Sequence, residues 1–584
     1  MKPSFKPIRF RGQRSLGSGL IPAGFLFYAL FLLFISLFLV NPQWDEYLDF
    51  AGCVGAANHL LAALKGHITD ITTITSDLEW YGNAFRWPAY LLWSIQKGFP
   101  VQIQGGSQSY DHFLLSGFSS SIHIVAVAYA VFGVYVYSQI VAKLRLNWLI
   151  GLLSVFCLSL SPFWLANATW NLKDLPVAVA LLVVELLALS PTNPSRSPLG
   201  SERQCFWAVA FMLALVLATK YAYLPLVTLL SFLYLFSRSL LASSAELPSF
   251  CLRSSLPLLR PTSFRVARNA FLQVLCALIL SLVFTPQFLG NPLYPLHAFD
   301  YFLRHPVVSI NRAQSISFFA SRLSYLMTPS FLVLAAVSCL GFWRFICSGR
   351  VWLRRPLGQA GVRKLIVCAF CLLPILFTVC PVLLSGRTFY GPDLRHVIWV
   401  YPPVLLFLAI SADYALRGSA KKIRLLFRAF ISFAILITFL ELLMIAPHFY
   451  SYLGVVPFHA GQVVAESGLV LSRYSPSQTP ELHRDLLLSC ARESACSSVL
   501  AQVRFSPDVH GSSSFSFPLN PSYYQAYLRL GDQSSSPNLF SAFGYSLEVD
   551  QSEACSMIEY GRHWPARLLS SLEICPADMS QGLK

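Results

Sequence analysis

The sequence predicts an all-α polytopic membrane protein of about 11 transmembrane helices, followed by a small C-terminal soluble domain. The 584 residues are 55% hydrophobic and only 12% charged, whereas soluble globular chains are typically about a quarter charged. The first apolar run, 20–40, has about the length of one bilayer crossing. A basic segment precedes it, but the run exceeds the ~7–15 apolar residues of a signal peptide and lacks a clear cleavage site. We therefore interpret it as an uncleaved first span.

The remaining apolar runs define the other expected spans and the links between them. The expected spans are 20–40, 113–141, 147–165, 176–191, 205–219, 222–237, 270–286, 328–346, 365–384, 397–416 and 429–446. If the N-terminus is cytoplasmic, the inner links collect more than half of all Lys and Arg residues, which fixes the orientation by the positive-inside rule. The net charge of +16 therefore reflects the orientation of the chain in the membrane and does not indicate binding to nucleic acid.

This orientation divides the chain into parts with different surroundings. Residues 1–19 form a basic cytoplasmic N-terminus, 20–446 a membrane domain whose first outer loop is 41–112, and 447–584 an extracytoplasmic soluble domain. An even number of cysteines in the exported part suggests two disulfides. Three pairings are possible, among them Cys490–Cys496 with Cys555–Cys575.

Polar residues gather where the spans meet the outer face. The acidic ones are Asp45 and Glu46 in "NPQWDEYLDF" and Asp174 in "NATWNLKDLP"; the cationic ones are Lys173, Lys220, Arg387, Arg395 and His396. Each alone has an ordinary explanation as an interface anchor or a solvated turn. The links after the third, fifth and ninth spans are short, however, and ionisable groups near the bilayer are costly unless they pair or function. Together they predict a cavity for an anionic ligand attached to lipid.

A lipid-linked sugar phosphate fits such a cavity. Arg and Lys hold phosphate, and a phosphate leaving group departs without being protonated. One carboxylate base then suffices, whereas glycosidases generally use two carboxyl groups. Asp45 or Glu46 is the expected base, with Asp45 favoured, and Asp49 is expected to be a supporting or solvated residue. No cofactor is certain; a divalent metal shared by the first-loop acids and Asp174 stays open.

Several short motifs resemble one known group of enzymes. They are the acidic pair after the first span, "WNLKDLP", "ATKYAYLP", "NPLYPLHAFDYFLRHP", "GPDLRHVIWVYPP" and "APHFYSYLG", in order over roughly 20–455. They resemble the GT-C superfamily of polyprenyl-phosphate-sugar-dependent glycosyltransferases, closest to the protein O-mannosyltransferases and the lipid A aminoarabinose transferase (glycosyltransferase family 39-like). The C-terminal tail takes no part in the resemblance, and "NLKD" departs from the common "NPKD".

The resemblance implies a GT-C-like fold in a bacterial inner membrane. It also implies inverting transfer of a sugar from a polyprenyl-phosphate donor to a glycan, lipid or protein hydroxyl at the outer face. By position, the first-loop acid of the family falls on Asp45 or Glu46, the second-loop acid on Asp174, and a phosphate-binding residue on Lys173. The sugar and the acceptor are not fixed by the sequence.

Two other classes of membrane protein are alternatives. A glycan polymerase, ligase or lipid-linked glycan transporter would share the polytopic form and the cationic cavity, but would not need a carboxylate pair in the first outer loop. An ion-coupled transporter should carry acidic residues inside its spans. Here only Glu185 and Glu441 clearly lie mid-membrane, and no internal repeat is evident.

Overall fold

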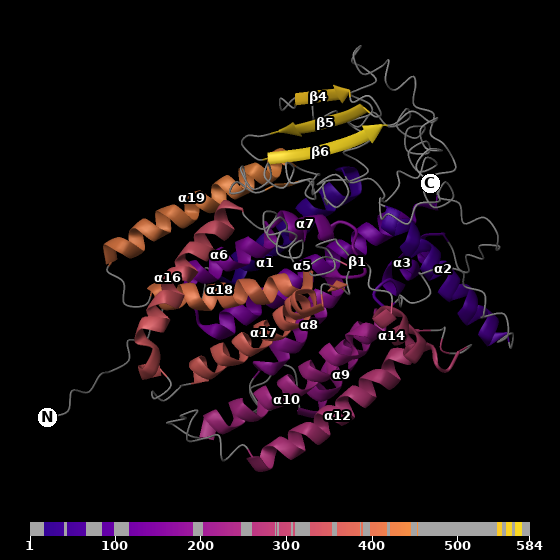
Figure 1. Ribbon diagram of the computed structural model, residues 1–584, viewed down its shortest axis with the longest axis horizontal. Coiled ribbons are helices and arrows are strands. Elements are labelled where there is room, and N and C mark those ends of the chain that lie inside the picture. Colours follow the sequence, from indigo (N-terminus) through magenta and orange to yellow (C-terminus); the bar gives the residue numbers. More distant parts are fainter. Residues whose placement is uncertain are drawn as a thin grey trace.

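Figure 1 shows the computed structural model of the chain, a bundle of long helices with an antiparallel sheet beside it. The structure describes residues 17–39, 44–65, 84–97, 116–190, 202–246, 260–285, 288, 291–304, 308–309, 328–352, 359–385, 387–388, 398–416, 421–445, 452–453, 546–551, 556–562 and 567–574.

The helices follow the apolar runs of the sequence. The first half of the chain forms α1 (Gly17–Phe34), the π-helical turn η1 (Ile35–Leu39), α2 (Trp44–Leu64), α3 (Trp87–Lys97), α5 (Phe118–Leu144), α6 (Trp148–Ser159), α7 (Pro162–Ala168), α8 (Leu175–Ala188), α9 (Glu202–Leu217), the 3₁₀ turn η5 (Tyr221–Tyr223) and α10 (Leu224–Glu246). The second half forms α12 (Arg260–Val283), α14 (Tyr294–Arg304), α16 (Pro329–Trp352), α17 (Gln359–Ser385), α18 (Tyr401–Leu416) and α19 (Lys421–Ile445).

Several of these helices are suited to crossing a membrane. Five described segments are long and apolar enough: Phe118–Leu144, Tyr221–Ser243, Phe264–Val283, Ile398–Leu416 and Leu425–Leu443. Helices α6 and α7 make a sixth if they count as one span, although they meet at a 50° bend. Pro162 opens α7, and its missing backbone donor explains this break in the expected span 147–165. Each expected span overlaps a described helix or this bent pair, so the helical membrane fold is confirmed, while the number of crossings stays a prediction.

The outer surface of the bundle is apolar, as a lipid-facing surface must be. Large exposed hydrophobic side chains line α1, α12 and α19: Leu26, Phe27, Leu30, Phe34, Phe264, Phe271, Leu272, Leu275, Ile279, Leu425, Leu426, Phe430, Phe433, Leu436 and Leu440. Soluble monomers rarely expose contiguous apolar patches of this kind. The protein is therefore an integral membrane protein.

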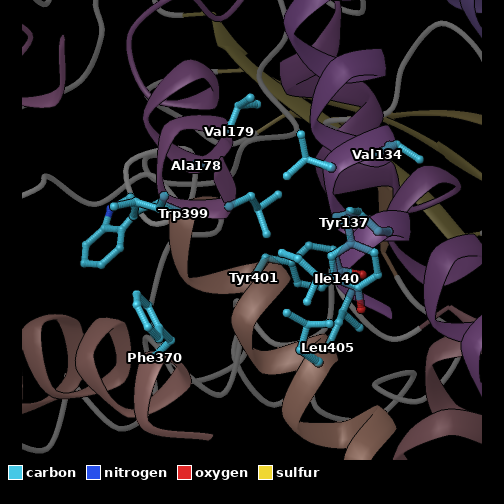
Figure 2. Close-up of a cluster of buried hydrophobic side chains, with 14 of the residues drawn as sticks. Val134, Tyr137, Ile140, Ala178, Val179, Phe370, Trp399, Tyr401 and Leu405 are labelled. Carbon is cyan, nitrogen blue, oxygen red and sulfur yellow. The ribbon is translucent and has the colours of Figure 1, made fainter. Parts of the chain in front are cut away.

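The core joins helices from distant parts of the sequence. Figure 2 shows Tyr137 of α5, Phe370 of α17 and Tyr401 of α18 in one buried apolar cluster. Close helix approaches need small residues: the backbone oxygen of Ser411 in α18 occupies the place where a Cβ at Gly341 of α16 would lie. Close packing of this kind therefore holds α16 and α18 together.

The links between helices collect at the two ends of α5. Phe118, the first residue of α5, packs against Phe50 of α2 with ring centroids 5.1 Å apart. In the last turn of α5, the carbonyl oxygen of Lys143 accepts a hydrogen bond from Arg363 of α17 at 3.4 Å. We call these the α2 end and the α17 end; a 27-residue helix separates them by about 40 Å. Which end faces the cytoplasm stays a prediction.

A small antiparallel sheet follows the helices. Its strands are β3 (Tyr452–Leu453), β4 (Ser546–Gln551), β5 (Ser556–Arg562) and β6 (Arg567–Ile574), in the spatial order β3-β6-β5-β4. A second, two-stranded ladder pairs β1 (Val308–Ser309) with β2 (Arg387–Thr388). The larger sheet is consistent with a folded C-terminal domain; its extracytoplasmic position stays a prediction.

Candidate functional site

The candidate site lies at the α2 end and starts with the π-helical turn η1. Ser36 in this turn donates its hydroxyl to the carbonyl oxygen of Thr169 at 3.0 Å. The carbonyl oxygen of Ser36 lies 2.6 Å from Nδ1 of His123 in α5. A π turn changes the backbone pairing locally and is common near functional sites. The end of the first helix is thereby fixed to the link that carries Lys173 and Asp174.

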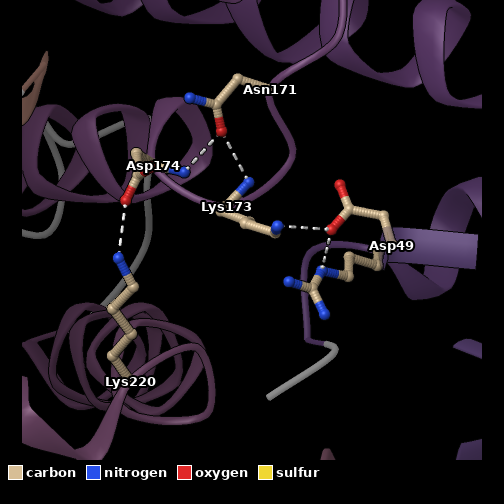
Figure 3. Close-up of polar contacts among 6 residues, drawn as sticks. Asp49, Asn171, Lys173, Asp174 and Lys220 are labelled. Atoms are coloured by element: carbon tan, nitrogen blue, oxygen red, sulfur yellow. Dashed lines mark hydrogen bonds and ion pairs between the residues drawn. The ribbon is translucent and has the colours of Figure 1, made fainter. Parts of the chain in front are cut away.

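Asp49 joins two cations inside the protein. Its Oδ1 lies 2.9 Å from Nε of Arg86 and 3.4 Å from Nζ of Lys173. Figure 3 shows Lys173 reaching across from the α7–α8 link to this carboxylate. Asp49 and Arg86 are almost fully buried, and the Lys173 side chain is 11% exposed. The expectation that Asp49 is solvated is therefore wrong, because burial leaves it dependent on its cations; a supporting role remains.

Asn171 shapes the link that presents Lys173 and Asp174. Its Oδ1 accepts the backbone N–H groups of both residues at 2.9 Å, and its Nδ2 donates to Oδ1 of Asn167 at 2.6 Å. An Asn side chain that accepts backbone donors two and three residues on is a typical turn former. Asp174 then pairs with Lys220, whose Nζ lies 3.0 Å from Oδ1. The turn thus directs Lys173 toward Asp49 and Asp174 toward Lys220.

These contacts form one group of buried charges from distant segments, which we call the Asp49 cluster: Asp49, Arg86, Lys173, Asp174 and Lys220. Buried ion pairs contribute little to stability, because desolvation offsets their attraction. Ionisable groups held at such cost in a membrane protein are typical of functional sites. The cluster brings three cations and two carboxylates together in one buried part of the bundle.

Aromatic side chains cover one side of the cluster. The Trp93 ring of α3 lies 5.7 Å from Phe50 and 5.5 Å from Phe118, both in edge-to-face geometry. Trp93 donates its indole N–H to the carbonyl oxygen of Ser116 at 3.0 Å. This packing buries the residue next to Asp49. It lowers the local dielectric and strengthens the charge interactions beside it.

The residue after Lys220 makes a second set of contacts that fix this part of the chain. The neighbouring Tyr221 hydroxyl lies 3.1 Å from the hydroxyls of both Ser281 and Thr285 at the end of α12. The Tyr221 ring makes an edge-to-face contact with Tyr294 of α14, with centroids 6.0 Å apart. The α9–α10 link, α12 and α14 thus meet beside the buried ammonium group, which fixes its position toward Asp174.

The other expected site residues are placed only in part. Asp45 and Glu46 lie in the first turn of α2, but their side chains are outside the described part of the structure. The backbone of Arg387 is in β2, opposite Ser309 of β1. The remaining expected residues lie outside the described residues: Arg395, His396, Cys490, Cys496, Cys555 and Cys575. Among the described side chains no group of three or more His, Cys, Asp or Glu residues is arranged to hold a metal ion.

Two residues of the site were not expected from the sequence. Arg86 stands in the aromatic stretch before α3, where a single cation carries no periodic signal. Asn171 precedes the motif "LKDLP", and only its turn-forming residue type could have indicated its role. Asp49 had a usable signal, because it lies one helical turn after Asp45 and therefore on nearly the same face of α2.

Comparison with solved structures finds two that are similar along most of the chain. They are crystal structures of ArnT from Cupriavidus metallidurans, one in the apo state and one bound to undecaprenyl phosphate. The TM-scores are 0.44 and 0.43 with 14% sequence identity in both cases; the alignments cover 94% and 95% of this chain and 97% and 98% of the ArnT chains. No protein-family model matches the sequence, and none of the curated proteins matches it.

Proposed function

We propose that the protein is a glycosyltransferase that moves a sugar from a polyprenyl-phosphate donor to an acceptor hydroxyl at the outer face of a bacterial inner membrane. The observation that carries the proposal is the Asp49 cluster, in which cations and carboxylates from distant segments lie buried together at one end of a membrane bundle. A phosphate fixed to a lipid tail reaches such a place from within the bilayer. The motifs that resemble the GT-C superfamily agree with this chemistry.

Lys173 is the residue best suited to take the donor phosphate. Its side chain is 11% exposed, whereas those of Arg86 and Lys220 are 2% and 4% exposed. Its 3.4 Å contact with Asp49 is also longer than the 2.9 Å contact of Arg86. If the Lys173 ammonium turns to a phosphate, Asp49 keeps Arg86 as its partner. The cation can therefore move to the ligand without leaving a buried carboxylate unpaired.

The base of the reaction comes from the start of α2. Asp45 precedes Asp49 by four residues, and Glu46 precedes it by three, so the two are turned from Asp49 by about 40° and about 60° around the helix axis. Asp45 is thus nearer to the face that meets Lys173, and we assign it as the base. It takes the acceptor proton as the sugar–phosphate bond opens, with inversion at the anomeric carbon. The phosphate leaves unprotonated, so no general acid is needed.

Asp174 and Lys220 position the phosphate-binding link. Asp174 lies directly before α8, and its pair with Lys220 fixes this helix start against the α9–α10 link. Because Lys173 is its sequence neighbour, any shift of Asp174 moves the phosphate-binding ammonium as well. We therefore assign Asp174 and Lys220 to positioning, with Lys220 close enough to add positive potential at the phosphate.

The test is mass spectrometry of envelope glycans from cells with and without the gene. We expect one glycan species to lose a hexose, pentose or amino sugar when the gene is deleted, and to regain it with the wild-type gene. Lys173→Met should not restore it, whereas Lys97→Met, an exposed lysine at the end of α3, should. Unchanged glycans in the deletion strain would overturn the proposal.

A further inference from the structure

Cations also crowd at the opposite, α17 end of the bundle, far from the Asp49 cluster. Arg363 in the second turn of α17 donates to the backbone carbonyl oxygen of Lys143 at 3.4 Å, which places its guanidinium beside the last turn of α5. Arg145 follows two residues after Lys143, where the chain turns with a positive φ of 50°. We call Lys143, Arg145 and Arg363 the Arg363 group. Arg363 is close enough to repel the charge of Lys143, and Arg145 that of Arg363, so an anion beside the group would be attracted.

Asp413, a carboxylate at this end of the bundle, is engaged with other partners. Asp413 in α18 lies 2.5 Å from Nζ of Lys364 through Oδ2, and its Oδ1 accepts the backbone N–H of Asn147 at 2.8 Å. Within the part of the chain that the structure describes, Arg363 makes no ion pair, and its buried Nε has no hydrogen-bond partner. A buried guanidinium N–H without an acceptor is costly, so the surroundings of Arg363 do not fully satisfy its hydrogen-bonding groups.

The surroundings strengthen the positive potential there. Burial is the larger cause that lowers the pKa of Arg363 below its usual value; the positive charge of the nearby Arg145 lowers it further and is the part that reports a positive potential. Trp148, at the start of α6, is 62% exposed and carries the guanidinium of Arg428 over its ring at 5.7 Å. Exposed Trp beside cations is typical of the level of lipid headgroups.

We propose that the Arg363 group binds the phosphate of an anionic phospholipid headgroup. The phosphate oxygens would accept N–H groups of the half-buried Arg363 guanidinium and lie beside the side chains of Lys143 and Arg145, which reduces the repulsion among the three cations. This site is separate from the donor site, because α5 spans about 40 Å between the two. Its ligand is a resident membrane lipid, so the proposal does not depend on the glycosyltransferase assignment.

The experiment measures lipid binding to the purified full chain by native mass spectrometry and by thermal unfolding in detergent. Phosphatidylglycerol is the anionic probe, phosphatidylcholine the control of equal chain length, and inorganic phosphate the soluble probe. The variants are Arg363→Gln and Arg145→Asn; Asn tolerates the positive φ at this position. Arg268→Gln is the matched control, because it removes an exposed cation from α12 outside the group.

We expect phosphatidylglycerol to bind and to raise the unfolding temperature more than phosphatidylcholine does. Each of Arg363→Gln and Arg145→Asn should weaken this binding by about fivefold, and Arg268→Gln should leave it unchanged. Equal stabilisation by the two lipids, or wild-type affinity in both group variants, would overturn the proposal. Stabilisation by millimolar inorganic phosphate alone, lost in Arg363→Gln, would support the anion site and assign it to a soluble phosphate.

Discussion

The contact between Asp49 and Lys173 gives the sharpest prediction of the account. At 3.4 Å and an effective dielectric of about 20, the attraction of the two charges is about 5 kcal/mol. Partial exposure of Lys173 and the cost of desolvation reduce the net value, and we expect a coupling free energy of about 2 kcal/mol. Asp49→Asn alone should destabilise the protein by about 3–5 kcal/mol, because it removes a buried carboxylate that pairs with two cations.

A double-mutant cycle measures this coupling. Wild type, Asp49→Asn, Lys173→Met and the double variant are purified in mixed micelles, and their unfolding free energies are determined by titration with SDS. If the two residues interact, the cost of Asp49→Asn should be smaller by about 2 kcal/mol when Lys173 is already neutral. A parallel cycle with Lys97→Met is the control, because this exposed lysine makes no described contact with Asp49.

The outcome that refutes this reasoning is additivity. If the Asp49→Asn and Lys173→Met effects add within about 0.5 kcal/mol, the two residues do not interact in the folded protein. The proposal that the Lys173 ammonium turns from Asp49 to the donor phosphate would then be wrong. If the coupling is present in the ligand-free protein and falls when polyprenyl phosphate is added, the exchange is supported.

Three further predictions concern the base, the packing and the topology. Asp45→Asn should lower the transfer rate by about 10²-fold or more with normal expression, since the acceptor proton then has no base; a larger loss in Glu46→Gln than in Asp45→Asn would contradict the assignment. Gly341→Ala should destabilise the bundle by about 1–3 kcal/mol, because the new Cβ meets the Ser411 carbonyl. Gly24→Ala is the control and should be neutral, because its Cβ meets nothing within 4 Å. Equal unfolding temperatures of the two variants would contradict the packing. Reporter fusions after residues 446 and 360 should report outside and inside respectively, and a cytoplasmic tail would contradict the predicted orientation.

The helices could be predicted from the sequence because composition determines them in a membrane. A backbone surrounded by lipid must satisfy its own hydrogen bonds, so every long apolar run becomes helical. The break at Pro162 was missed although proline gives its signal, because the apolar run continues through it. The π turn Ile35–Leu39 could not be foreseen, since no residue type specifies it.

The candidate site could be predicted only as a set of residues on one face. Short links at the same end bring Lys173, Asp174 and Lys220 together, and the contacts agree with that expectation. The pairing could not be foreseen, because Asp49 meets Arg86 and Lys173 only through the packing of α2 and α3 against α5. Local sequence patterns carry no information on such distant contacts.

A transfer assay in proteoliposomes tests the central claim most directly. The purified chain is reconstituted with polyprenyl-phosphate sugars extracted from the source membranes and with the glycan identified by mass spectrometry as the acceptor. We expect one equivalent of free polyprenyl phosphate for each sugar transferred, and almost none with Asp45→Asn. Intact donor that appears on the opposite leaflet, without release of polyprenyl phosphate, would contradict the account and identify a lipid-linked glycan transporter instead.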